Sequence, residues 1–89
     1  MTDYYNMSDA DIEKSIESMA DKCKRKADKN IDRYIKLVEM NAGKGIKARI
    51  LEQVYINLFL YHLFSGNSEL ADFYGKSHII HRLENNLGV

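Results

Sequence analysis

Two adjacent tyrosines near the amino terminus are the first residues whose types and positions suit binding. Tyr4 and Tyr5 are followed directly by Asn6. Aromatic rings stack on nucleobases, and an asparagine amide both donates and accepts hydrogen bonds, as the edge of a base requires. The alternative is structural: Met7 packs near Ile12 at the start of a helix, and the tyrosines lie on a neighbouring helix. The sequence leaves both interpretations open.

Basic residues form a second candidate feature. The chain carries 13 basic and 13 acidic residues and no net charge, yet residues 22–49 hold ten basic residues against three acidic ones. Five of the basic residues recur at helical spacing and are predicted to form one stripe, which comprises Lys22, Lys26, Lys29, Arg33 and Lys36. A narrow stripe suits a small phosphate ligand better than a duplex, which needs several phosphate contacts. The alternative is a solvated face where bases pair with neighbouring acids such as Asp28 and Asp32.

No catalytic, cofactor or metal signature accompanies these residues. The run Gly43-Lys44-Gly45 lacks the spacing of a P-loop, and we expect it to be a turn between helices. His78 and His81 can share a helix face but have no third ligand nearby, so we expect no metal site. Cys23 has no adjacent histidine and is expected to be a small buried residue. We therefore expect a protein that is not an enzyme and needs no cofactor.

The composition indicates a single globular domain. A chain of 89 residues is too short for two hydrophobic cores, and 45% apolar with 29% charged residues is typical of globular proteins. One cysteine excludes an internal disulfide framework and fits a reducing compartment. The first residues lack the charged and apolar regions of a signal peptide, and no stretch reaches the roughly 20 apolar residues that span a bilayer. We expect a soluble, cytoplasmic protein without membrane contact.

The elements that must position these residues are predicted to be all α-helical, in one domain over residues 1–89. Proline is absent and the first glycine is Gly43, so nothing interrupts a helix over residues 8–42 that begins at Ser8. Asp28 to Asn30 is a soft spot where this helix can kink. After an arm of residues 1–7, the predicted helices are 8–42, 46–64 and 68–84.

The end of the first helix and the start and buried face of the third helix are also predicted. Gly43 is available for a left-handed C-cap of the first helix, and Ser68 with Glu69 can cap the third. Hydrophobic spacing assigns the buried face of the third helix to Leu70, Phe73, Tyr74, Ile80 and Leu83.

The apolar surface of the second helix predicts self-association. Two long helices joined by a short glycine turn are expected to fold back as an antiparallel hairpin. Residues 54–64 are apolar on nearly every face, and one partner helix cannot cover them all. We expect a homo-oligomer that buries the spare surface between copies. The alternative is a monomeric three-helix bundle in which the third helix covers enough.

Residues 4–63 resemble the small helical-hairpin sponge proteins with which phages sequester cyclic oligonucleotide signals of the CBASS defence. That family has a tyrosine and then a Leu-Ser pair opening its first helix, to which Tyr4-Tyr5-Asn6-Met7-Ser8 is similar. Its second helix begins Ala-Arg and continues Leu-Gln-Gln-aromatic, to which the segment from Ala48 to Tyr55 is similar.

The resemblance implies a hexamer of hairpins with the nucleotide held between protomers. It implies that a tyrosine stacks on the bases, which transfers to Tyr4 or Tyr5 with Asn6 as a neighbour, and that a lysine fifteen residues later holds phosphate. Met19 stands at that spacing, and Lys22 lies one turn further along the same face.

A second, shorter segment is similar to the Hha/YmoA group of nucleoid modulators, which bind H-NS-type proteins. Glu69-Leu70-Ala71-Asp72-Phe73-Tyr74 and His81-Arg82-Leu83 are similar to that group's Glu-Leu-Ala-x-Phe-Tyr and His-Arg-Leu. This resemblance implies a partner protein rather than a small ligand.

The expected function is non-catalytic sequestration of a cyclic dinucleotide by a phage-type, host-cytoplasmic homo-oligomer. Its expected ligand-binding residues are Tyr4, Tyr5, Asn6, Lys22 and Lys26, with Lys26 in reserve for Lys22. The alternative is a small protein-interaction module, either a Hha-like partner of a nucleoid protein or an inhibitor of another host factor. Weak nucleic-acid binding by the basic stripe is a further, less favoured class.

Overall fold

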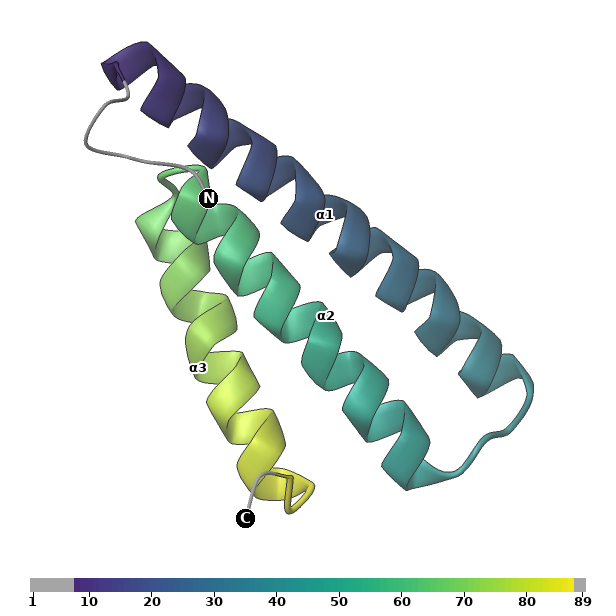
Figure 1. Cartoon of the computed structure of the whole chain (residues 1–89). Coiled ribbons are helices and arrows are strands. Elements are labelled where there is room, and N and C mark those ends of the chain that lie inside the picture. The colour runs from purple at the N-terminus through teal and green to yellow at the C-terminus, as the bar shows by residue number, and fades with distance from the viewer. Residues whose placement is uncertain (1–7, 88–89) are drawn as a thin grey trace.

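The structure is a computed structural model, and it describes residues 8–87 of the chain. It comprises α1 (Asp9–Glu39), α2 (Lys44–Phe64) and α3 (Ser68–Glu84), drawn in Figure 1. Within the described residues there is no strand. The prediction of an all-helical chain with three helices is therefore confirmed.

The first helix, α1, is one continuous helix of 31 residues, without a break at the expected soft spot. Ser8 is its N-cap: the Ser8 hydroxyl accepts a hydrogen bond from the Asp11 backbone N–H at 3.2 Å and donates one to the Asp11 carboxylate at 2.9 Å. Asp9 and Asp11 lie in the first turn, where negative charge interacts favourably with the helix dipole. The helix ends at Glu39, before the predicted end at residue 42.

All three helices end with a residue in the left-handed conformation. Asn41 has φ 55°, Gly66 has φ 79° and Asn86 has φ 55°. After Asn41, the Ala42 N–H donates to the Leu37 carbonyl oxygen at 2.9 Å, the 6→1 bond of a Schellman motif. The expectation that Gly43 takes the left-handed position is wrong, because Asn41 tolerates that conformation and comes first in the chain.

The starts of α2 and α3 also differ from the expected ones. Gly43 is the N-cap of α2, so this helix starts at Lys44, two residues before the predicted start. Asn67, rather than Ser68, caps α3, because its side-chain oxygen accepts a hydrogen bond from the Leu70 N–H at 3.2 Å.

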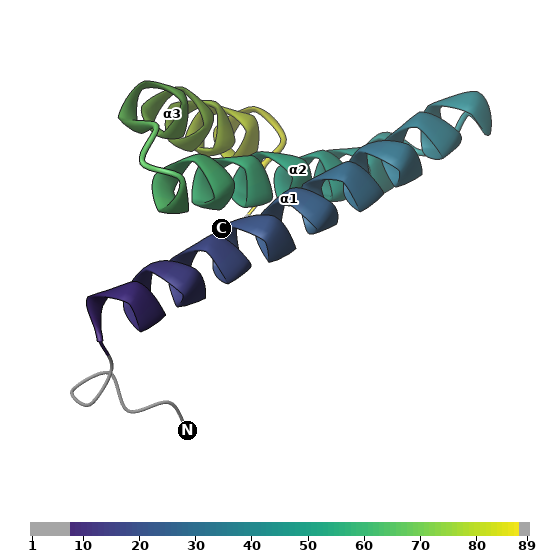
Figure 2. The ribbon, with the colours of Figure 1, turned by 90° about the horizontal axis from the view of Figure 1, so that it is seen from above.

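The middle helix in space is α2, which lies between α1 and α3 in both views of the molecule (Figures 1 and 2). Arg33 and Leu37 of α1 lie beside Ile46 and Ile50 of α2. The molecule is elongated, with extents of 49 × 24 × 23 Å, because α1 is longer than the helices that pack beside it.

The contact between α2 and α3 involves small and polar residues of α3, together with Tyr74, whose ring stacks on His62 of α2. A Cβ atom added at Gly75 would lie 3.3 Å from two ring carbons of Phe59, so the glycine allows the ring to approach the α3 backbone. His81 is buried, and its Nε2 atom donates to the Ala48 carbonyl oxygen at 2.7 Å. Ala71 is the other buried residue of α3.

The predicted buried face of α3 is therefore wrong in four of its five residues. Leu70, Phe73, Ile80 and Leu83 are exposed, and Tyr74 alone is half-buried. The reason is the close contact at Gly75, which turns the large apolar side chains of α3 away from α2.

The core of residues 8–87 is built almost entirely from alanine. Its fully buried apolar residues are Ala20, Ala27, Ala48, Val54 and Ala71, and none of the largest side chains is completely buried. Twelve large apolar side chains are exposed, from Ile16 in α1 to Leu83 in α3. Fully burying a large aliphatic side chain contributes about 1.5–3 kcal/mol, so these exposed side chains leave apolar stabilisation unused in a single copy.

Candidate functional site

The sequence-predicted site residues are only partly within the described chain. Tyr4, Tyr5 and Asn6 lie outside residues 8–87. Lys22 and Lys26 lie on α1, one turn apart, and both are exposed. Their side chains are therefore accessible to an anion.

The basic stripe comprises Lys22, Lys26, Lys29, Arg33 and Lys36, and all five residues are exposed on α1. Within residues 8–87, none of the five takes part in an ion pair. The stripe is solvated, as the alternative expects, but within the described residues Asp28 pairs with Lys24 and not with a base of the stripe. Its positive charge is therefore available for an anionic partner.

The ion pair that α1 does contain involves a different lysine. Lys24 donates to the Asp28 carboxylate at 2.8 Å, and this hydrogen bond raises the pKa of the Lys24 ammonium group. On α3, the corresponding hydrogen bond from Lys76 to Asp72 raises the pKa of Lys76. Both are exposed i,i+4 pairs, which water and salt screen, so they contribute little to stability.

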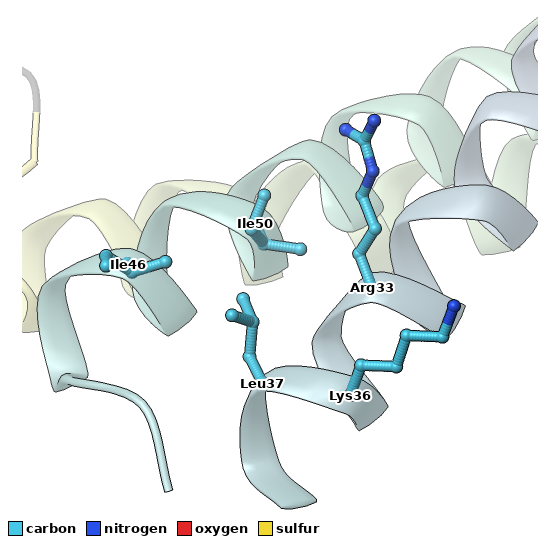
Figure 3. Close-up of a pocket in the computed structure, with 5 residues that line it drawn as sticks. All are labelled: Arg33, Lys36, Leu37, Ile46 and Ile50. Atoms are coloured by element: carbon cyan, nitrogen blue, oxygen red, sulfur yellow. The ribbon is translucent and has the colours of Figure 1, made fainter. Parts of the chain in front are cut away.

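A pocket of about 340 Å³ lies between α1 and α2, near the loop that joins them. Its lining comprises Arg33, Lys36, Leu37, Ile46 and Ile50. In Figure 3, Leu37 points from α1 toward Ile46 and Ile50 of α2, Arg33 runs alongside this aliphatic cluster, and the end of Lys36 extends away from it. The pocket thus joins the carboxyl-terminal end of the basic stripe to an apolar surface.

The pocket combines two kinds of ligand contact. Aliphatic side chains provide a surface that a flat, weakly polar group can contact at a small free-energy cost of desolvation. Arg33 presents a planar set of donors that matches phosphate oxygens, and Lys36 adds a point charge. An anion with an apolar or aromatic body is the ligand class that this combination suits.

Sequence reasoning had placed Arg33 and Lys36 in the stripe but had missed the aliphatic wall. Leu37 belongs to α1, whereas Ile46 and Ile50 come from the start of α2, so only the contact between the two helices brings them together. Ile46 is 58% exposed, which no hydrophobic pattern reveals. Lys26 lies seven residues before Arg33, about 10 Å along the helix, so the structure does not bring Lys22 and Lys26 into this pocket.

The two histidines considered as metal ligands face α2 instead of an open site. His78 Nε2 lies 3.4 Å from the Glu52 carboxylate, which also forms an ion pair with the Arg82 guanidinium at 3.1 Å. The two ring nitrogens of His81 form hydrogen bonds with the Ala48 carbonyl oxygen and the Asn85 side-chain amide. In the part of the chain that the structure describes, no three His, Cys, Asp or Glu residues are placed to hold a metal ion.

Cys23 is half-buried rather than buried, and it forms no disulfide. Among residues 8–87, no helix combines the length and the apolar character needed to cross a membrane. No family model matches the chain, and no curated protein or solved structure matches it either.

Proposed function

We propose that this protein binds a cyclic dinucleotide without converting it. The observation that carries the proposal is the pocket in which Arg33 and Lys36 border the aliphatic side chains of Leu37, Ile46 and Ile50. A cyclic dinucleotide has two phosphates and two flat bases, so it needs cations and an apolar surface within a few ångströms of each other. The pocket supplies both.

The ligand contacts follow from the chemistry of each side chain. A base lies on Leu37, Ile46 and Ile50, and the adjoining phosphate accepts hydrogen bonds from Arg33 and Lys36. Lys22 and Lys26 continue the same positive stripe along α1 and are the phosphate contacts that the sequence predicts. Tyr4 or Tyr5, with Asn6, would complete the recognition of the bases.

Sequestration requires no chemistry beyond binding. A protein present in excess over its ligand lowers the free concentration of the signal by mass action. An effector that needs the free signal then stays inactive. The absence of turnover in this proposal rests on the sequence, in which no catalytic set of residues occurs.

We further propose that copies of the chain associate, with α1 and α2 as an antiparallel hairpin in each. The exposed apolar side chains support this, because monomeric proteins rarely leave so many large ones uncovered. Burial of these side chains between copies would add the stabilisation that the alanine-rich core of one copy lacks.

Isothermal titration calorimetry with 3′,3′-cGAMP tests the binding proposal. We expect heat of binding for the wild type and an affinity at least about tenfold lower for Arg33→Ala/Lys36→Ala, since charge-assisted hydrogen bonds to phosphate are lost. Lys22→Ala/Lys26→Ala measures separately whether the sequence-predicted lysines contribute. Lys44→Ala/Lys76→Ala removes the same charge away from the stripe and is the control. Absence of heat for the wild type would refute the proposal.

A second candidate function is a protein-interaction module, and the outward side of α3 favours it. Phe73 and Leu83 are 59% and 74% exposed, and they belong to the segments that resemble the Hha/YmoA group. Such a module would bind a purified H-NS-type protein in pull-down, unaffected by nuclease or added nucleotide. Phe73→Ser/Leu83→Ser would abolish that binding and leave the nucleotide titration unchanged.

A further inference from the structure

Two stripes of opposite charge run along α1 between Glu17 and Glu39. The basic stripe, from Lys22 to Lys36, was described above. The acidic stripe comprises Glu17, Asp21, Asp28, Asp32 and Glu39, at steps of four and seven residues. At 3.6 residues per turn, the two stripes lie about 110° apart around the helix, on the side opposite Ala20 and Ala27. Five acids therefore stand beside five bases on one helix.

Neither stripe is satisfied within a single copy. All five acidic residues are exposed, as are all five basic ones. Among residues 8–87, Asp28 is the one member of either stripe that forms an ion pair, and its partner Lys24 belongs to neither. Nine charged side chains thus project from α1 without an oppositely charged partner in the described part of the chain.

We propose that the acidic stripe of one copy docks on the basic stripe of a second copy, with the two α1 helices parallel. A constant offset of five residues places Glu17, Asp21 and Asp28 opposite Lys22, Lys26 and Arg33 of the second copy. This offset is the one by which charged residues pair between parallel helices in coiled coils. The same offset places Ile35, 49% exposed, opposite Met40, 75% exposed.

The orientation follows from symmetry. Antiparallel copies related by a two-fold axis would place like stripe beside like stripe, which is repulsive. Parallel copies place unlike stripes together. Lys24, which would face Lys29 of the second copy at this offset, is already hydrogen-bonded to Asp28, and this bond reduces the repulsion.

This inference names the partner for the self-association part of the proposed function and does not depend on the nucleotide. It also gives Lys22 and Lys26 a second role, because the same ammonium groups meet either a phosphate or the carboxylates of a second copy. A dinucleotide bound there would weaken the assembly.

Sedimentation velocity of the full chain without nucleotide tests the proposal. We expect association at 50 mM NaCl that weakens about tenfold or more at 500 mM, because exposed ion pairs are screened by salt. Glu17→Lys/Asp21→Lys and Lys22→Glu/Lys26→Glu should each be monomeric alone. An equimolar mixture of the two variants should associate, since the two substituted stripes attract each other with exchanged signs and the two unsubstituted stripes keep their wild-type pairing. Glu69→Lys/Glu84→Lys, with the same change in charge on α3, should associate like the wild type.

Each other outcome overturns the inference. A wild type that is monomeric at low salt refutes both the pairing of the stripes and the proposed self-association. Association that persists unchanged in both stripe variants leaves self-association standing but shows that the apolar surface alone carries it. Failure of the mixture to associate, with both variants helical by circular dichroism, refutes the pairing of the stripes. Titration of Glu17→Lys/Asp21→Lys with 3′,3′-cGAMP then reports on the nucleotide site by itself, because neither residue lines the pocket.

Discussion

The Nε2 atom of His81 lies 2.7 Å from the carbonyl oxygen of Ala48, and this buried hydrogen bond joins α3 to the first half of α2. A carbonyl oxygen only accepts, so Nε2 carries the proton and Nδ1 is the acceptor for the Asn85 amide, 3.2 Å away. Both ring nitrogens thus have a hydrogen-bond partner. The edge of the Tyr55 ring packs on the same imidazole, with the ring centroids 5.4 Å apart.

Replacement of this histidine should destabilise the fold. His81→Ala removes the hydrogen bond and leaves a cavity between α2 and α3, so we expect a loss of about 2 kcal/mol in the free energy of unfolding. Ile80→Ala deletes a large apolar side chain that is 53% exposed, and it should change the free energy of unfolding by less than about 0.5 kcal/mol. Urea unfolding followed by circular dichroism measures both. Equal effects of the two variants would contradict the burial of His81.

The contact between Phe59 and Gly75 predicts that a larger side chain at Gly75 destabilises the fold. A β-branched side chain in Gly75→Val would overlap the Phe59 ring, whose carbons lie 3.3 Å from the position of a Cβ atom alone. We expect a destabilisation of about 1–3 kcal/mol from this overpacking. Truncation of the ring in the background of Gly75→Val should recover part of the loss in a double-mutant cycle.

The control for this experiment is a glycine with open space. A Cβ atom at Gly45, in the first turn of α2, would have no neighbour within 4 Å. Gly45→Ala should therefore stabilise α2, by up to about 1 kcal/mol. Were Gly75→Val as stable as the wild type, α3 would have to pack on α2 by a different face.

The left-handed backbone at Asn41 makes a third prediction. Asn41→Ala keeps the Cβ atom at φ 55° but removes the short polar side chain that makes this conformation accessible to asparagine, and it should lower the free energy of unfolding by about 1 kcal/mol. Asn41→Gly keeps the conformation accessible and should be at least as stable as the wild type. Thermal unfolding of the two variants, compared with Glu39→Ala in the last turn of α1, distinguishes this backbone effect from loss of a polar side chain. An Asn41→Ala variant as stable as Asn41→Gly would argue against the Schellman motif.

Local signals predicted the helices well. Ser8 caps α1 because its hydroxyl group forms hydrogen bonds with both the backbone N–H and the carboxylate of Asp11, three residues later in the chain. The absence of proline and of glycine before Gly43 predicted a long first helix, and α1 extends from Asp9 to Glu39. Such signals depend on residues close together in the sequence, so they can be recognised without knowledge of the fold.

Contacts between helices were predicted poorly, and α3 shows why. Hydrophobicity assigned Leu83 and Phe73 to its buried face, yet the structure packs α3 through Gly75 and His81. The roles of Gly75 and His81 depend on the residues that they contact in α2, Phe59 and Ala48, so the sequence of α3 alone does not predict them. The aliphatic wall of the pocket was missed for the same reason, since Leu37 and Ile46 belong to different helices.

The two helix pairs are held together by different kinds of contact, and this affects how freely each can slide. Between α2 and α3, the hydrogen bond from His81 to the Ala48 carbonyl oxygen and the ion pair of Arg82 with Glu52 fix the longitudinal alignment. Between α1 and α2, no side-chain hydrogen bond or ion pair joins the helices over residues 8–87, and the buried apolar residues on the α1 side are Ala20 and Ala27. A lengthwise displacement of α1 along α2 and α3 would therefore break no side-chain hydrogen bond or ion pair between α1 and α2 within the described residues.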